Sequence, residues 1–295
     1  MNIKINDDNV VVTVLGLPSE TELKDQIEKL ISSLCSEISL PMNLISEVNI
    51  NPIKIGDGFF GMIACPSCNP IEFNIIIKNT VIWDCFDVNK PDEKKKIAKA
   101  IIIHELYHCK ENYITSLNTN LDDIMKHPPV TTTRLLMLDI GHVQFSEYYA
   151  HRNSSLISYE IKNDMKLIYN THVELLALQE RTKNCQYDFS FNYEEIHSFI
   201  KYVVKYVAIY SCSHDERFRI LLDTLEKDYP LICKYIKFIF EILDVEYLNY
   251  PENASKEKFS LIGKSLLSIY QYYNLYFTDD NVQNVFTVKY IIKTE

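Results

Sequence analysis

The stretch "PDEKKKIAKAIIIHELYHCKENYIT", residues 91–115, carries the strongest structural signal in the chain. A proline followed by two acids suits the first turn of a helix, because no proline N–H is needed there and acids stabilise the positive end of the helix dipole. Ile101, His104 and His108 then recur at helical spacing. Since apolar residues also occupy other faces, the pattern predicts a buried helix over 92–115.

The same helix contains a His-Glu-x-x-His motif. His104 and His108 project from one side of a helix, one turn apart, where their ring nitrogens can bind one zinc ion at about 2.0–2.1 Å. Glu105 lies on the flank of that face, where a carboxylate can deprotonate a water. With 8 histidines in 295 residues, a chance match is on the order of one in a hundred. The motif therefore predicts one Zn²⁺ per chain rather than an ordinary buried helix.

A third zinc ligand has to come from outside the motif, because catalytic zinc takes three protein ligands and keeps one position open. The best stretch is "FSEYYAHRNS", residues 145–154. Glu147 and His151 are four residues apart and share one helical face. We expect Glu147 to be the ligand and His151 to orient a ligand from one turn away. His151 itself and His142 remain the alternative ligands.

The flanking sequence predicts an α+β fold. We expect a small antiparallel sheet over 53–87, packed on a pair of helices over 92–115 and 134–160. Gly141 is a possible point of interruption in the second helix. The further elements expected are a strand over 9–16, a helix over 19–39 with Ser19 as its N-cap, a loop over 116–133, helices through 163–277 and a weak strand near 284–293. These elements suggest a catalytic region, 1–160, that contains the His-Glu-x-x-His motif, and a mostly α-helical C-terminal region, 161–295.

Composition restricts the partners. The net charge of −10 argues against nucleic acid as a partner, because that needs a basic face. No apolar run reaches the roughly 20 residues of a membrane span, so no membrane partner is expected. The N-terminus shows no export signal, and the 8 cysteines are irregularly spaced, which predicts reduced thiols and a cytoplasmic location.

One pair of cysteines, in "CPSC" at residues 65–68, has the Cys-x-x-Cys spacing of metal-binding and redox motifs. Together with Cys85 and Cys109 it could form a second zinc site, but the paired second motif that such sites need is missing. A redox role requires a reactive thiol, and no helix clearly starts after the pair to activate one. The sequence therefore favours a plain turn at this position.

These residues together resemble the zincin metallopeptidases of the gluzincin type. There, a His-Glu-x-x-His helix is followed by a second helix that carries a glutamate ligand. The resemblance covers residues 53–155 at the level of motifs, and compact intracellular zincins, including the ImmA/IrrE-type regulatory peptidases, are the nearest analogy. It implies that His104, His108 and Glu147 bind zinc and that Glu105 is the general base. It also implies that an edge strand, expected within 71–86, pairs with the substrate backbone.

The chain departs from that family at His151, where many gluzincins have an acid. Tyr148, Tyr149, His151 and Arg152 are, by their proximity to Glu147, the candidates for a group that stabilises the oxyanion. Of these, His151 and Tyr148 are the predicted catalytic residues beside Glu105. The predicted function is hydrolysis of peptide bonds in an intracellular protein or peptide substrate. The alternative is a zinc-binding sensor or partner-binding module without turnover. The oligomeric state is left open.

Overall fold

A computed structural model describes residues 1–5, 20–51, 60–120, 124, 132–155, 170, 173–174, 177, 189–213, 216–252, 254–273, 275–280 and 285–290. The chain divides into two compact units, which are described separately. Unit 1 comprises Met1–Ile114 and Asn153–Tyr159, and unit 2 comprises Thr115–Arg152 and Glu160–Glu295. The expected α+β class is confirmed, with a small sheet in unit 1 and a mostly helical C-terminal half.

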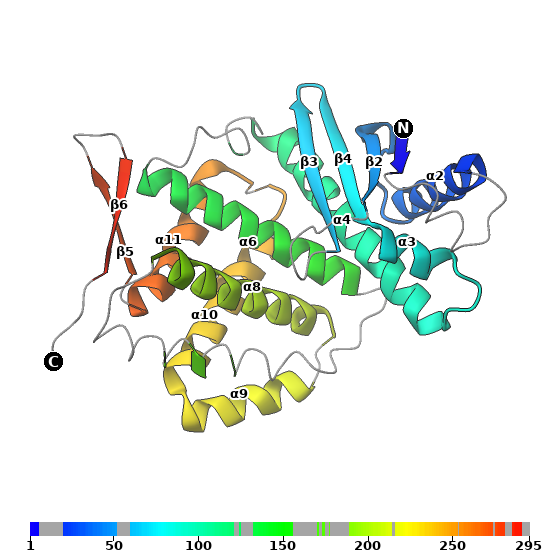
Figure 1. Cartoon of the computed structure of the whole chain (residues 1–295). Coiled ribbons are helices and arrows are strands. Elements are labelled where there is room, and N and C mark those ends of the chain that lie inside the picture. Colours follow the sequence, from blue (N-terminus) through cyan, green and yellow to red (C-terminus); the bar gives the residue numbers. More distant parts are fainter. Residues whose placement is uncertain are drawn as a thin grey trace, which may run out of the picture. The chain divides into compact units, whose positions relative to one another are not determined.

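The sheet of unit 1 is mixed, not antiparallel as the sequence suggested (Figure 1). Its strand order is β1-β2-β4-β3, and the strands are β1 (Asn2–Ile5), β2 (Ile45–Asn51), β3 (Gly61–Cys68) and β4 (Ile71–Lys78). β1, β2 and β4 run parallel, and only β3 is antiparallel to its neighbour. Parallel pairing sets buried Val48 beside Ile75 and Ile50 beside Ile77, which the hairpin-like spacing of the sequence did not reveal.

Three α-helices accompany the sheet in the described part of unit 1: α2 (Glu20–Glu37), α3 (Asn79–Phe86) and α4 (Asp92–Asn118). A short 3-10 helix, η1 (Met42–Leu44), precedes β2. α2 and α4 confirm the helices expected over 19–39 and 92–115. α3 corrects the end of the sheet expected over 53–87, because residues 79–86 form a helix in which Val81, Ile82 and Cys85 are buried at helical spacing. The strand expected over 9–16 and the N-cap at Ser19 lie outside the described residues.

α4 buries one stripe in the core of unit 1. Ala98, Ile102, Leu106 and Cys109 lie along this stripe and belong to the same apolar cluster as the inner residues of the sheet. Near the end of the helix, Lys110 Nζ donates a hydrogen bond of 2.6 Å to the carbonyl oxygen of Ile38. Ile101, on the face that carries the two motif histidines, is only partly buried and packs against the border of this cluster.

Unit 2 is built from helices and one hairpin. Its described elements are α6 (Thr133–Ser155), α8 (Phe189–Ser213), α9 (Glu216–Asp228), α10 (Pro230–Leu248), α11 (Lys256–Tyr272), β5 (Leu275–Asp280) and β6 (Val285–Tyr290). α11 ends at Tyr272, and β5 replaces the end of the helical region expected to reach 277. β6 confirms the weak C-terminal strand and pairs antiparallel with β5. Most of 163–188 lies outside the description.

α6 runs without interruption through Gly141. A Cβ atom on Gly141 would lie 1.8 Å from the carbonyl oxygen of Phe259, and one on Gly263 would lie 1.7 Å from that of Met137. The backbones of α6 and α11 therefore touch, and glycine serves close packing here instead of loosening the helix. This contact, with Phe145 and Tyr148 in the core of unit 2, groups most of α6 with the helical half, whereas the sequence had assigned 134–160 to the first region.

Among the helices that the structure describes, none has the length and apolar character needed to cross a membrane.

Candidate metal centre

The first half of the candidate site lies on α4. The Nε2 atoms of His104 and His108 are 3.0 Å apart, and the two rings meet edge to face with their centroids 4.7 Å apart. Two nitrogen ligands at tetrahedral positions on one zinc ion would be separated by on the order of 3.3 Å. The helix therefore directs both nitrogens toward one point, as the four-residue spacing predicted.

Glu105, between the two histidines in sequence, is buried and contacts β3. Its side chain is 7% exposed. A Cβ atom added to Gly61 at the start of β3 would lie 2.7 Å from Cγ of Glu105 and 2.9 Å from its Oε1. Only a glycine leaves this space free, so the backbone of β3 packs directly on the carboxylate of the motif.

β3, the strand that packs on Glu105, is the last strand in the order β1-β2-β4-β3. β4, within the range 71–86 where the edge strand was expected, pairs with β2 on one side and with β3 on the other. The edge expectation is therefore corrected from β4 to β3, whose described pairing is with β4 alone. The sequence could not distinguish them, because both strands of a hairpin carry similar apolar patterns.

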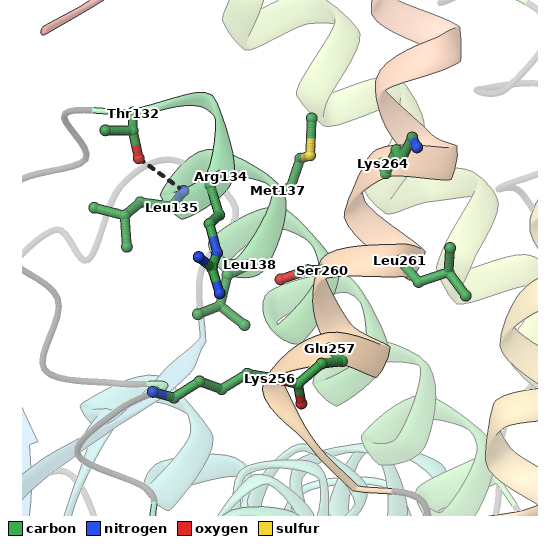
Figure 2. A pocket seen from close by; sticks show the side chains of 10 residues that line it. All are labelled: Thr132, Arg134, Leu135, Met137, Leu138, Lys256, Glu257, Ser260, Leu261 and Lys264. Carbon is green, nitrogen blue, oxygen red and sulfur yellow. Dashed lines mark hydrogen bonds between the residues drawn. The ribbon is translucent and has the colours of Figure 1, made fainter. Parts of the chain in front are cut away.

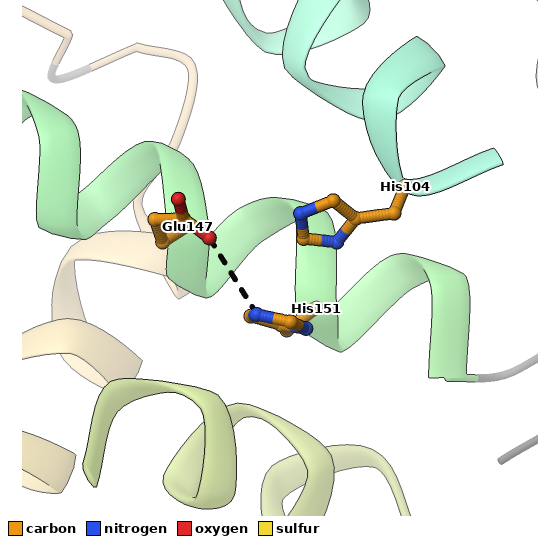
Figure 3. A group of neighbouring side chains, drawn as sticks. All are labelled: His104, Glu147 and His151. Atoms are coloured by element: carbon orange, nitrogen blue, oxygen red, sulfur yellow. Dashed lines mark ion pairs between the residues drawn. The ribbon is translucent and has the colours of Figure 1, made fainter. Parts of the chain in front are cut away.

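The second half of the candidate site lies on α6. Glu147 and His151 sit one turn apart, and Oε2 of Glu147 is 3.5 Å from Nε2 of His151 (Figure 3). The other carboxylate oxygen of Glu147 lies 3.5 Å from Nζ of Lys201 on α8. The pairing of a carboxylate with a histidine one turn later agrees with the arrangement expected from the sequence. Lys201 had no sequence signal, because its proximity depends on the packing of α8 against α6.

α8 also places a histidine, His197, within the electrostatic reach of Glu147 and Lys201. Nδ1 of His197 lies 3.1 Å from the hydroxyl of Tyr270. Burial, together with the positive charge of Lys201, lowers the pKa of His197 to about 4. His197 is therefore neutral at pH 7, and Lys201 is the cationic partner that α8 presents to Glu147.

Tyr148 is held inside unit 2. Its hydroxyl lies 2.6 Å from Ser211 Oγ, donates to Asp244 Oδ1 at 3.0 Å and accepts from Arg152 Nη1 at 3.0 Å. Arg152 also pairs with Asp244, and burial raises the pKa of Tyr148 well above its usual range. A fully buried tyrosine whose hydroxyl has three polar neighbours favours a structural role for Tyr148 over the catalytic role expected from the sequence.

His142, the rival ligand, is buried and packs on α11. Its ring meets that of Phe259 edge to face with the centroids 5.0 Å apart. Phe259 is also the residue whose carbonyl approaches Gly141. This position favours packing for His142 and leaves Glu147 and His151 as the ligand candidates of α6.

A pocket of about 590 Å³ lies elsewhere in unit 2, between the first turns of α6 and α11 (Figure 2). Its charged lining residues are Arg134, Lys256, Lys264 and Glu257, and leucines such as Leu135 and Leu261 add apolar surface. None of the predicted ligands or catalytic residues lines it. The pocket therefore adds nothing to the candidate metal centre.

In the described parts of the chain, His104, Glu147 and His151 are the side chains whose ligand atoms lie close enough together to hold a metal ion. His108, a ligand expected from the sequence, is not in this group, whereas His151, an alternative ligand, is. Figure 3 draws these three side chains. Comparisons of the chain with protein-family models, curated proteins and solved structures found no match. Functional inference therefore rests on the side chains themselves.

Proposed function

We propose that this chain is a zinc-dependent metallopeptidase that hydrolyses a peptide bond of a protein or peptide. His104 and His108 of α4 and Glu147 of α6 are the zinc ligands, and Glu105 is the general base. The observation that carries the proposal is the convergence of the two Nε2 atoms, 3.0 Å apart, beside a buried glutamate.

The donor set fits zinc. Two imidazole nitrogens and one carboxylate oxygen are ligands that catalytic zinc takes in proteins, with a fourth position left for water or substrate. His151 can either orient Glu147, from which it is 3.5 Å away, or act as a ligand itself. Lys201 balances the charge of Glu147 from the side of α8.

In the proposed hydrolysis, the zinc ion and the side chains of the protein have separate tasks. Zinc, when bound, supplies a Lewis acid and lowers the pKa of its water to about 7. Glu105 accepts the proton of the attacking water and later donates it to the leaving amine. Gly61 leaves room for this carboxylate, and β3, which among the described strands pairs with β4 alone, offers an edge on which an extended peptide backbone can add as a further strand.

The metal content of purified variants tests the ligand set. We expect about one zinc per chain in the wild type and its loss in Glu147→Ala, because that carboxylate completes the three ligands. Glu194→Ala, at an exposed glutamate of α8, is the matched control and should keep zinc. Elemental analysis without added metal gives the readout. Zinc retained at wild-type content in Glu147→Ala would contradict the proposed site.

A second pair of variants separates ligand from orienting partner. His108→Ala should lose zinc as completely as Glu147→Ala, whereas His151→Ala should weaken affinity by about 10- to 100-fold, as an outer hydrogen-bond partner does. Competition with a zinc chelator measures both. The opposite order would make His151 the ligand and His108 the accessory group.

The contact between β3 and Glu105 predicts a variant that alters activity more than stability. In Gly61→Ala the new methyl group must displace the carboxylate, and a shift of about 1 Å in a catalytic group costs on the order of 100-fold in rate. Thermal unfolding should change little, since the end of a flexible side chain is what moves. Met62→Ala, at the next, exposed residue, is the control. Turnover of a quenched-fluorescence peptide library at the wild-type rate in Gly61→Ala would contradict the role of this contact.

A further inference from the structure

Cys65 and Cys68 lie on β3 and point toward one another. Residues three apart in a regular strand face opposite sides of the sheet. Here the pairing register of β3 with β4 shifts between Ala64 and Ser67, which is the mark of a bulge. The two Sγ atoms are consequently 3.6 Å apart. "CPSC" is therefore the bulged end of a strand and not the plain turn that the sequence favoured.

The two thiols are accessible and held in place. Both cysteines are only partly buried, and the Cys65 thiol also donates to the carbonyl oxygen of Ser67 at 3.2 Å. Other cysteines of unit 1 contrast with them, because burial raises the pKa of Cys35 to about 11 and that of Cys85 to about 12. Thiols that are buried in this way are poor nucleophiles.

A metal is a weaker explanation of the pair. Zinc held by cysteines needs four protein ligands. Among the described side chains, the only group able to hold a metal ion is that of His104, Glu147 and His151, and it includes neither cysteine. Cys85 and Cys109, the partners considered from the sequence, are buried.

We propose that Cys65 and Cys68 form a reversible redox pair, which a small-molecule disulfide of the oxidised-glutathione type converts into an intramolecular disulfide. The thiolate of one cysteine attacks a sulfur of the small disulfide and releases one small thiolate. The thiolate of the other cysteine attacks the mixed disulfide and releases the second. The two cysteine protons pass to the released thiolates. The protein loses two electrons and the small disulfide gains them.

The pair is independent of the proposed zinc site, since neither thiol belongs to its ligand set. The bulge keeps the second thiol beside the first, so the closing step is intramolecular and the mixed disulfide should not accumulate. Once closed, the bond would join the two ends of the bulge in β3.

The test uses the full chain treated with oxidised glutathione, followed by alkylation of the remaining thiols and peptide mass spectrometry. We expect a Cys65–Cys68 bond that forms at least about tenfold faster than any glutathione adduct at Cys212, another partly exposed cysteine. Cys65→Ser should instead accumulate a glutathione adduct at Cys68. Cys212→Ser, the matched control, should form the bond at the wild-type rate.

Two results would overturn the inference. One is that Cys65 and Cys68 remain alkylatable, or carry separate adducts, at concentrations that modify Cys212. The other is that zinc content falls in both Cys65→Ser and Cys68→Ser but not in Cys212→Ser, which would make the pair a metal site. The first result has no bearing on the zinc ligands of α4 and α6. After the second, the zinc content of Glu147→Ala distinguishes them from the cysteine pair, since zinc retained in that variant would belong to the cysteines.

Discussion

A Glu105→Gln protein should keep its zinc and lose turnover of a quenched-fluorescence peptide library by about 100- to 10,000-fold, the usual contribution of a general base. Glutamine has nearly the same shape, so it fits the space that Gly61 leaves beside β3. Its amide, however, cannot accept the proton of the attacking water. Elemental analysis and initial rates on the same preparation give both readouts.

Glu93→Gln, at an exposed glutamate in the first turn of the same helix, is the matched control and should behave as wild type. Wild-type turnover in Glu105→Gln with zinc retained would exclude this mechanism. A wild-type protein that binds zinc yet cleaves no peptide of the library would favour the alternative of a zinc-binding sensor or partner-binding module. The metal assay and the activity assay thus answer different questions.

The second large effect concerns folding. Gly141→Ala should destabilise the protein by about 3 kcal/mol or more, because helices in close contact cannot accept an added methyl group without moving apart. The Cβ atom would lie 1.8 Å from the carbonyl oxygen of Phe259, and backbone cannot move aside as a side-chain end can. Chemical denaturation followed by circular dichroism measures the change.

Whether Gly141→Ala lowers or raises the stability of the protein is informative by itself. At an ordinary helix position, glycine to alanine stabilises by about 1 kcal/mol, because alanine has the higher helix propensity. Leu261→Ala, at an exposed residue of α11, should change stability by less than about 1 kcal/mol and serves as the control. A Gly141→Ala protein more stable than wild type would show that α6 and α11 do not touch at this residue.

Much of the candidate site follows from local rules. The four-residue spacing of His104 and His108 places both rings on one side of any α-helix, and the same spacing pairs Glu147 with His151. Each helix was also predictable from its own stretch, since Pro91 and two acids favour a start at Asp92. These features depend on residues within one or two turns of each other, so the sequence carries them directly.

Other features depend on residues far apart in the chain. Tyr148 of α6 is buried against Ser211 of α8 and Asp244 of α10. No sequence pattern near Tyr148 predicts these contacts. Gly61 carried a weak signal, because a glycine in a strand often marks a close approach, but the group that approaches it was not predictable.

What the sequence by itself determined is the α+β class, the two helices expected over 92–115 and 134–160, and the face on which each presents its candidate ligands. The structure has these helices at Asp92–Asn118 and Thr133–Ser155. Only the tertiary structure decided that the sheet is mixed, that β3 is its edge strand beside Glu105, and that a bulge brings Cys65 and Cys68 together. The physical reason is the sequence distance over which the interactions act. Helical periodicity is set by neighbours within a turn, whereas strand order, register and close backbone contacts are set by packing between segments far apart in the chain.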